Sequence, residues 1–290
     1  MNRLSLNGLD ATAIYTMSQE PSVYTDRGTG YNGATDQLWG DWPLERIETI
    51  RAGWPSLLHL GDGSEVVISH DFPTQLIFNK RSSVGTGNWN EELLPHDAPE
   101  GVSWNRAAVG GSDDNSIHLI VLTMPGANQS VDPPLTYQGL DGAILYSRSQ
   151  DGGESWDIQN VVIPGMDSTS TLGYSADQYA IHARGEKVVI GVFEDFADSF
   201  VMISEDNGDT WTKRILVDFP VDMYTGNDEI IDLNEDMLAD TVYNTDNGGA
   251  IYIDNAGLAH VSWGNMFYLD DVLGDDQWSY FPYTDGLAYW

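Results

Sequence analysis

Four hairpin-like segments recur along this chain of 290 residues, and their repetition constrains the fold more than any other feature. Each has an apolar run, a short turn rich in Gly, Asp or Asn, and a second run rich in β-branched residues. The hairpins occupy residues 54–72, 104–124, 177–193 and 249–264. Gly and Asn supply the positive φ angles that tight turns require. The pattern therefore predicts antiparallel β structure.

A third and a fourth strand follow three of the hairpins. The third strands are predicted at residues 74–82, 143–149 and 199–204, and the fourth at 90–95, 158–164 and 212–220. Each fourth strand ends at a Pro, which cannot donate to a ladder and suits an edge. Repeated four-stranded antiparallel units are propeller blades. The sequence thus predicts an all-β propeller with blades at about 51–95, 103–165, 172–220 and 246–290.

The remaining segments define the predicted domain limits. Residues 1–30 carry little pattern and are expected to form an irregular lead-in to a propeller domain over 31–290. Residues 31–50 fit the last two strands of another blade, as when an N-terminus closes a ring. The blades that can be counted are too few for a closed ring, and the chain ends at Trp290 within an apparent third strand. We therefore expect an incomplete propeller, truncated at its C-terminus.

Two segments match the pattern Ser-x-Asp-x-Gly-x-x-Trp at the predicted turn between third and fourth strands. They contain Ser149, Asp151, Gly153 and Trp156 in one copy, and Ser204, Asp206, Gly208 and Trp211 in the other. Ser and Asp side chains accept hydrogen bonds from turn amides, Gly adopts the left-handed conformation, and Trp packs into the blade. A third segment, 82–89, keeps Ser82 and Trp89 but has Val84 and Thr86 in place of Asp and Gly.

These motifs resemble the Asp box, or bacterial neuraminidase repeat, of the sialidase superfamily of propellers. The resemblance implies a fold that has six blades when whole. It also implies that the box residues lie on the rim, away from the central site, and serve folding. The wider pattern over residues 30–290 resembles secreted propeller proteins of environmental bacteria, which implies a secreted or cell-surface location.

The same resemblance suggests where catalytic residues would lie. Sialidases of the superfamily bind the substrate carboxylate with three arginines, use an Asp as acid/base, and use a Tyr assisted by a Glu as nucleophile. Their first arginine stands in an Arg-Ile-Pro motif; here Arg51 precedes Pro55 by four residues, which departs from that spacing. Asp71 follows the second strand of the same blade and corresponds to the acid. For the other arginines, Arg106, Arg148 and Arg184 lie in later blades, without a matching motif.

Composition restricts the partners. The formal net charge is −33, which repels phosphate backbones and excludes nucleic acid as a partner. The charge fits either a solvated surface in salty surroundings or Ca²⁺ chelation, since carboxylates are preferred Ca²⁺ ligands. Without Cys, disulfides, thiolate catalysis and Cys-based zinc sites are excluded. No apolar run has the length of a membrane span, and no signal peptide is visible.

One acidic loop is a candidate Ca²⁺ site. Asp232, Asn234, Asp236 and Asp240 place oxygen ligands at alternate positions, as at the start of a Ca²⁺-binding loop. The run lacks the Gly at the sixth position and the acid at the twelfth that an EF-hand loop requires. A solvated loop is the alternative, and no other cofactor is predicted.

The sequence leaves two functions open. The first is a non-catalytic scaffold that binds a glycan or an extracellular protein through its loops. The alternative is a glycoside hydrolase, with exo-sialidase first in that class. Convergence of three arginines at the central end of the first strands would distinguish the two. A protein of salty cytoplasm would explain the charge but not the Asp-box motifs.

Overall fold

The protein is an all-β structure. The computed structural model describes residues 3–7, 10–71, 75–227, 230–275, 277–281 and 286–290. Within these ranges the only helical segment is the short 3-10 turn η1 (Gly126–Asn128). The strands form five four-stranded antiparallel sheets. This confirms the predicted fold class of an all-β propeller with four-stranded blades.

In the first four sheets each strand pairs with the next one along the chain. The first sheet contains β1 (Leu4–Asn7), β2 (Asp10–Met17), β3 (Gly28–Thr35) and β4 (Leu38–Trp39). The second contains β5 (Gly53–His59), β6 (Glu65–Asp71), β7 (Gln75–Arg81) and β8 (Asn90–Leu94). The third contains β9 (Val102–Gly110), β10 (Ser116–Thr123), β11 (Ile144–Ser149) and β12 (Ile158–Val161). The fourth contains β13 (Tyr179–Arg184), β14 (Lys187–Val192), β15 (Ser199–Ser204) and β16 (Thr212–Val217).

The fifth sheet departs from this order. It contains β17 (Val242–Ile253), β18 (Ala259–Leu269), β19 (Ser279–Phe281) and β20 (Leu287–Tyr289). Both β19 and β20 pair with β18, at different stretches of it, so they share the third-strand position.

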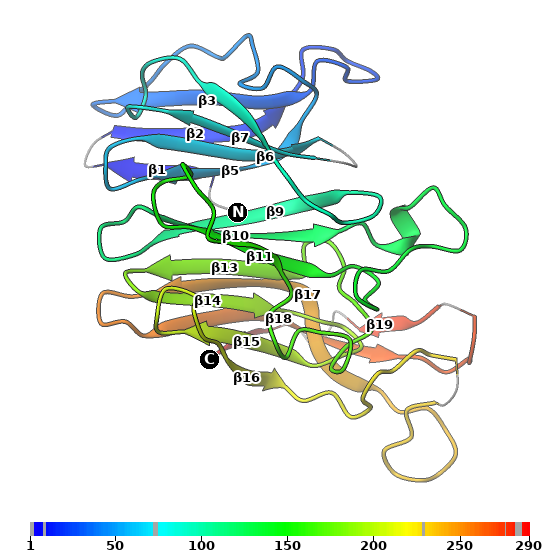
Figure 1. Cartoon of the computed structure of the whole chain (residues 1–290). Coiled ribbons are helices and arrows are strands. Elements are labelled where there is room, and N and C mark those ends of the chain that lie inside the picture. Colours follow the sequence, from blue (N-terminus) through cyan, green and yellow to red (C-terminus); the bar gives the residue numbers. More distant parts are fainter. Residues whose placement is uncertain (1–2, 8–9, 72–74, 228–229, 276, 282–285) are drawn as a thin grey trace.

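The sheets stack face to face in chain order. The first strands of consecutive blades pack on one another, β5 on β9, β9 on β13, and β13 on β17. Figure 1 shows the sheet β1–β4 at one end of the molecule, with the fourth and fifth sheets overlapping in the view at the other end. The described strands therefore form an open arc of blades, as expected for an incomplete propeller.

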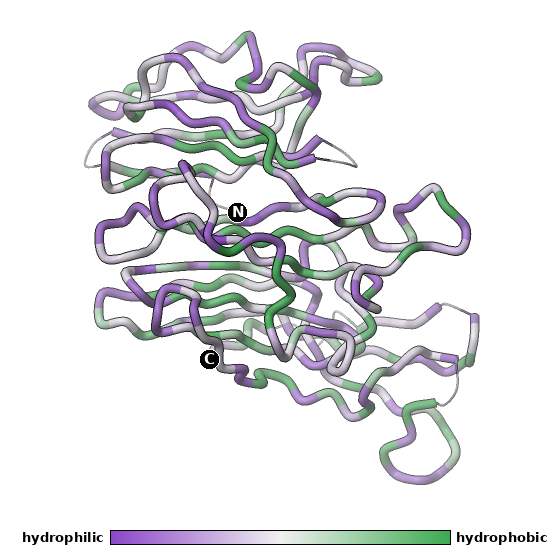
Figure 2. The backbone as a smooth tube through the Cα atoms, in the orientation of Figure 1, coloured by the Kyte–Doolittle hydropathy of each residue, from purple (hydrophilic) through white to green (hydrophobic). Residues whose placement is uncertain are grey.

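The hydrophobic core lies between the sheets as separate layers. One cluster joins the second and third sheets, a second joins the third and fourth, and a third joins the fourth and fifth. A smaller cluster around Ile14, Leu57 and Val67 joins the first sheet to the second. Figure 2 shows the apolar residues along the middle of the strands. Full burial of one such side chain contributes about 1.5–3 kcal/mol, so blade stacking stabilises the arc.

The structure corrects the prediction for the N-terminal segment. The irregular lead-in expected over residues 1–30 is wrong, since β1, β2 and the start of β3 lie there. Most of β3, and all of β4, lie in the 31–50 region. Strand β3 pairs with β2, and β4 pairs with β3; neither pairs with the C-terminal sheet, so they do not close a ring. Strand β3 reads GTGYNGAT, a composition with little β propensity. Tertiary contacts hold it instead, among them the bond from the Thr29 amide to buried Glu48, at 2.8 Å.

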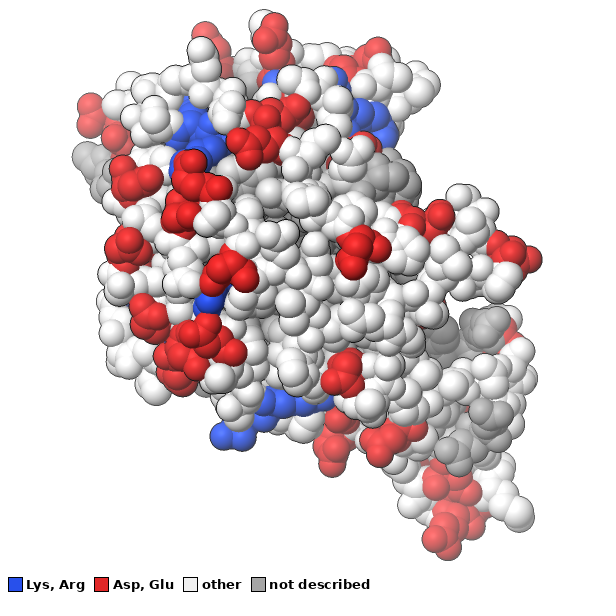
Figure 3. All heavy atoms as spheres, viewed as in Figure 1, with Lys and Arg blue, Asp and Glu red and all other residues white. Residues whose placement is uncertain are grey.

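The surface is strongly acidic. Figure 3 shows Asp and Glu side chains distributed over the visible face, with few Lys or Arg between them. No helix within the described residues has the length and apolar character needed to cross a membrane.

Candidate functional site

The antiparallel order of the strands sorts the connections onto two faces. Because neighbouring strands run in opposite directions, the start of each first strand and the end of each second strand lie on one face. We call it the long-loop face; Figure 1 shows its loops extending to the right. These loops include 18–27, 40–52, 95–101, 124–143, 162–178, 193–198, 218–241 and 270–275. The turns between third and fourth strands, which contain the Ser-x-Asp-x-Gly-x-x-Trp motifs, lie on the opposite face.

A left-handed residue stands near the long-loop end of each first strand in the second, third and fourth blades, and midway along the longer β17 in the fifth. These residues are Trp54 (φ 50°), Trp104 (φ 53°), Asp177 (φ 68°) and Asn247 (φ 62°). The pairing register of β5, β9 and β17 shifts at the same places, so three of the four residues belong to β-bulges. Positive φ is unfavourable for a bulky aromatic residue, and bulges turn side chains toward sites. We call the place where these first strands lie side by side the axis of the arc. The repeated strain in the first strands marks this axis as the candidate site.

The two bulged tryptophans enclose His70, at the end of β6. The Trp54 ring stacks on His70 with centroids 5.2 Å apart, and Trp104 contacts it edge-on at 6.2 Å. The Trp104 amide donates to His70 Nδ1 at 2.8 Å, which places the imidazole proton on Nε2. Burial, with Arg27 and Arg106 nearby, lowers the pKa of His70 to about 3. This histidine is therefore a neutral packing element at physiological pH.

An arginine-containing pocket opens beside these rings. Its volume is about 570 Å³, and it is lined by Arg3, Thr16, Met17, Ser18, Tyr24, Arg27 and Trp54. The Arg27 guanidinium lies over the Trp54 ring at 5.4 Å from the centroid, and its Nε donates to the Ala52 carbonyl at 2.9 Å. Arg27 Nη2 is buried and finds no hydrogen-bond acceptor among the described residues. We call this the arginine pocket.

Charged groups of both signs surround the arginine pocket. Burial is the main cause that lowers the pKa of both Arg3 and Arg27. A second arginine lowers each pKa further, Arg106 for Arg3 and Arg51 for Arg27, while Asp177 raises the pKa of Arg3 and Asp71 raises that of Arg27. An anion bound between the guanidinium groups would relieve both effects. The pocket is therefore suited to a carboxylate or another small anion, with Trp54 as an apolar wall.

The structure places both residues predicted as catalytic near this pocket. Arg51 is exposed, just before β5, and its Nε donates to the Tyr24 carbonyl at 3.0 Å. Asp71 is half-buried at the end of β6. Arg51 and Asp71 are both within electrostatic range of Arg27, since the first lowers and the second raises its pKa. Neither residue lines the pocket itself.

The other predicted arginines separate. Arg106 lies at the axis, where it donates to Asp177 and its guanidinium lies 5.4 Å from the Tyr179 ring centroid. Arg148 and Arg184 belong to the opposite face. Arg148 pairs with Asp157 at 2.6 Å and with Asp209 at 2.7 Å, and Arg184 donates to Asn255.

Sequence reasoning missed Arg3 and Arg27, which together with Arg106 form the arginine cluster of the axis. Both precede the first legible blade, in the segment that the sequence predicts to be irregular. The hairpin pattern of residues 10–35, weak as it is, was the one signal that could have identified them.

The two octapeptide motifs fold into the same turn. In the first, Gly153 N donates to Ser149 Oγ at 2.8 Å, and Ser155 N donates to Asp151 Oδ1 at 2.8 Å. In the second motif, Gly208 N donates to Ser204 Oγ at 2.8 Å, and Thr210 N donates to Asp206 Oδ1 at 2.9 Å. The carboxylates therefore cap turn amides on the face remote from the arginine pocket.

The motif tryptophans pack on the preceding blade. Trp156 contacts Phe78 of β7 at a centroid distance of 6.1 Å, and Trp211 contacts Tyr146 of β11 at 5.2 Å. In the degenerate copy, Trp89 contacts Tyr31 of β3 at 5.9 Å. Each tryptophan thus joins its blade to the third strand of the blade before it.

The acidic loop predicted to bind Ca²⁺ is folded on its own backbone. Asp232 accepts hydrogen bonds from the amides of Asn234, Asp236 and Met237, and Asp240 accepts one from Leu233. Within the described ranges no group of three His, Asp or Glu side chains is placed to hold a metal ion. These carboxylates are therefore not gathered around a common point.

Comparison with known proteins gives structural matches alone. No protein-family model matches the chain, and neither does any curated protein. A Dyadobacter fermentans protein of unknown function matches with a TM-score of 0.50 and 12% identity, over 96% of this chain and 79% of that one. A mutant of NanB sialidase from Streptococcus pneumoniae matches with a TM-score of 0.47 and 14% identity, over 86% of this chain and 33% of that one. An Aleuria aurantia lectin mutant matches with a TM-score of 0.45 and 13% identity, over 73% of this chain and 58% of that one.

These likenesses concern the fold. The chain spans a third of the sialidase and a little over half of the lectin that it matches. The order of its sheets and the match to the Dyadobacter protein define the chain as an all-β propeller whose four-stranded sheets form an open arc. Its distinguishing site is the arginine pocket on the long-loop face.

Proposed function

We propose that this chain is a non-catalytic binding propeller that recognises an acidic glycan at the arginine pocket. The observation that carries the proposal is the presence of Arg3 and Arg27 beside Trp54 in a chain of net charge −33. The arginines would bind the carboxylate of an acidic sugar through paired hydrogen bonds, and the Trp54 face would lie against the ring. The volume of about 570 Å³ accommodates one sugar residue and part of a second.

The octapeptide motifs support a structural role apart from this site. We infer that they are Asp boxes, because their Ser and Asp side chains accept hydrogen bonds from amides of the same turn and their tryptophans join neighbouring blades. Through this resemblance we also propose a secreted or cell-surface location, where acidic glycans and other proteins are the available partners.

Binding measurements test the proposal directly. Calorimetry is carried out with sialyllactose, with a glucuronic-acid oligosaccharide and with lactose as the neutral reference. We expect binding of at least one acidic sugar, weak binding of lactose, and loss of the preference in Arg27→Ala. The matched control is Arg214→Ala, an exposed arginine on β16 that changes the net charge equally. Equal affinity of the wild type for acidic and neutral sugars would refute the proposal.

The second candidate is an exo-acting glycoside hydrolase for the same acidic sugars. It is favoured by the position of Arg51 and Asp71, which both lie in the electrostatic surroundings of Arg27. Hydrolysis of a fluorogenic sialoside distinguishes the two functions. Turnover that disappears in both Arg51→Ala and Asp71→Asn would establish the hydrolase. Sugar binding without turnover would establish the binding propeller.

A further inference from the structure

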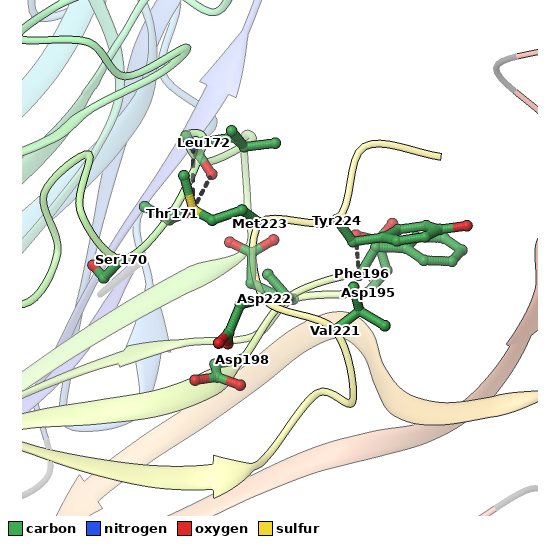
Figure 4. A pocket seen from close by; sticks show the side chains of 13 residues that line it. Ser170, Thr171, Leu172, Asp195, Phe196, Asp198, Val221, Asp222, Met223 and Tyr224 are labelled. Carbon is green, nitrogen blue, oxygen red and sulfur yellow. Dashed lines mark hydrogen bonds between the residues drawn. The ribbon is translucent and has the colours of Figure 1, made fainter. Parts of the chain in front are cut away.

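A second pocket on the long-loop face has the opposite charge. It lies beside the fourth and fifth blades and has a volume of about 150 Å³. Three segments line it: residues 170–173, 194–198 and 221–224. Figure 4 shows Asp198 and Asp222 at one end, with the stacked rings of Phe196 and Tyr224 at the other. We call this the acidic pocket.

Four carboxyl groups line the acidic pocket, namely Glu194, Asp195, Asp198 and Asp222, while none of its thirteen lining residues is Lys or Arg. Lys213 is within electrostatic range of Asp198, but its ammonium donates to the Gly165 carbonyl at 3.1 Å and lies over the Phe200 ring. No basic side chain among the lining residues therefore offsets the charge of Asp195, Asp198 and Asp222.

Glu194 is the most unusual of the four. It is 6% exposed, and its Oε1 has no hydrogen-bond partner within the described parts of the chain. Its backbone is fixed between two blades, because the carbonyl accepts from Thr245 Oγ1 at 2.8 Å. Burial raises the pKa of Glu194 well above its usual range, and the charge of Asp195 raises it further. A buried, unpaired carboxyl costs stability, so its presence in a pocket indicates a ligand group that completes it.

The aromatic end extends the binding surface. Phe196 and Tyr224 stack at 5.7 Å, and Trp278 meets Phe196 edge-on at 5.5 Å. These three rings also line an adjoining hollow of about 150 Å³ that contains Asp270. Asp270 accepts from the Tyr224 hydroxyl at 2.9 Å, and its other oxygen, Oδ1, is buried without a partner among the described residues. Carboxylates therefore lie on both sides of one aromatic wall.

We propose that the acidic pocket binds an organic primary ammonium group carried on a ring, as in an amino sugar with a free amine. The carboxylates would receive the ammonium hydrogens, and the Phe196–Tyr224 wall would contact the ring and the cation. A metal ion fits less well, because no three acidic side chains converge within the described residues. An ammonium group on a ring instead matches carboxylates spread along an aromatic surface. This site is separate from the arginine pocket and does not depend on its function.

Calorimetry with three probes tests the proposal: glucosamine, N-acetylglucosamine and CaCl₂. The two sugars differ at one nitrogen, which is a charged amine in glucosamine and a neutral amide with an acetyl group in N-acetylglucosamine. We expect glucosamine to bind, N-acetylglucosamine to bind at least tenfold more weakly, and Ca²⁺ not to displace glucosamine. Glucosamine dimer is expected to bind more tightly than the monomer, because the adjoining hollow contains Asp270.

Matched variants locate the binding. Asp222→Asn, at an exposed position, is expected to weaken glucosamine binding about three- to fivefold, the range of an exposed ion pair. Glu194→Gln preserves the shape and is expected to weaken it about tenfold. Asp41→Asn makes the same charge change at an exposed position in the first sheet's region and should leave binding unchanged. Thermal unfolding of each variant verifies that it is folded.

The outcomes separate clearly. The proposal would be overturned if the two sugars bound equally well. It would also be overturned if the Asp222→Asn and Glu194→Gln variants both bound glucosamine as tightly as the wild type does. Competitive displacement of glucosamine by Ca²⁺ would also overturn it and assign the pocket to a metal ion. If glucosamine binding were lost in Arg27→Ala but kept in Asp222→Asn, the amine would bind in the arginine pocket, and the assignment to the acidic pocket would be refuted.

Discussion

The glycine of each octapeptide motif lies against an aromatic ring of the preceding blade, and this contact predicts a large effect of a small substitution. Gly208 has a φ of +92°, and a Cβ added there would overlap Tyr146 Oη and lie 3.0 Å from its Cζ. Left-handed backbone costs a residue with a Cβ about 1–2 kcal/mol. Overpacking a filled contact costs about 1–3 kcal/mol more. We therefore expect Gly208→Ala to lower the free energy of unfolding by about 2–5 kcal/mol.

The degenerate motif supplies a matched control for this prediction. Gly87 has the same φ of +92°, and a Cβ there would meet nothing within 4 Å. Gly87→Ala should therefore lose only the backbone component, about 1–2 kcal/mol. The difference between the two variants isolates the contact between the third and fourth blades.

Urea unfolding followed by tryptophan fluorescence measures both variants, with the slope m compared to establish that the same surface is exposed. The double variant Gly208→Ala/Tyr146→Phe removes the overlapping hydroxyl. It should be less destabilised than the sum of its two single variants, because the residues are in contact. Equal losses for Gly208→Ala and Gly87→Ala, or strict additivity in the double variant, would refute the account of the motif as a connection between blades.

Three further predictions concern buried and charged groups. Arg81→Met should lower the free energy of unfolding, measured in urea, by about 3–5 kcal/mol, because it leaves fully buried Glu65 without the guanidinium that donates to it at 2.8 Å. The control, Lys80→Met, removes a more exposed ion pair and should cost under about 1 kcal/mol. Turn hydrogen bonds lower the pKa of Asp206 to about 2, so the stabilisation that its carboxylate contributes is present above pH 3.8 and is lost as the pH falls through 2. The difference in free energy of unfolding between the wild type and Asp206→Asn should therefore shrink over that window. A difference that does not change with pH would contradict this prediction. Because the pKa of His70 is about 3, its NMR signals should remain those of a neutral ring at pH 5, and titration near 6.5 would show that the axis is hydrated.

The sequence predicts the fold class from local features. Tight turns require Gly, Asn or Asp, and strands that are buried on both faces require β-branched and apolar residues, so residues 54–72 and 177–193 indicate hairpins by themselves. The octapeptide motif likewise predicts its own turn, because the hydrogen bonds that its Ser and Asp side chains accept come from amides within the same eight residues. Arg51 and Asp71 were selected by their order within a blade, and the structure places both near one arginine.

Tertiary structure alone decided the site. Arg3 and Arg27 lie just before β1 and β3, outside any strand, and they meet Trp54 only because the first sheet packs on the second. The acidic pocket joins segments as far apart as Ser170 and Tyr224, which no local pattern connects. The left-handed conformations of Trp54 and Trp104 are unfavourable locally and exist because blade packing compensates for them. Short-range hydrogen bonding and periodicity thus determined the blades, whereas long-range packing between blades determined which side chains share a pocket.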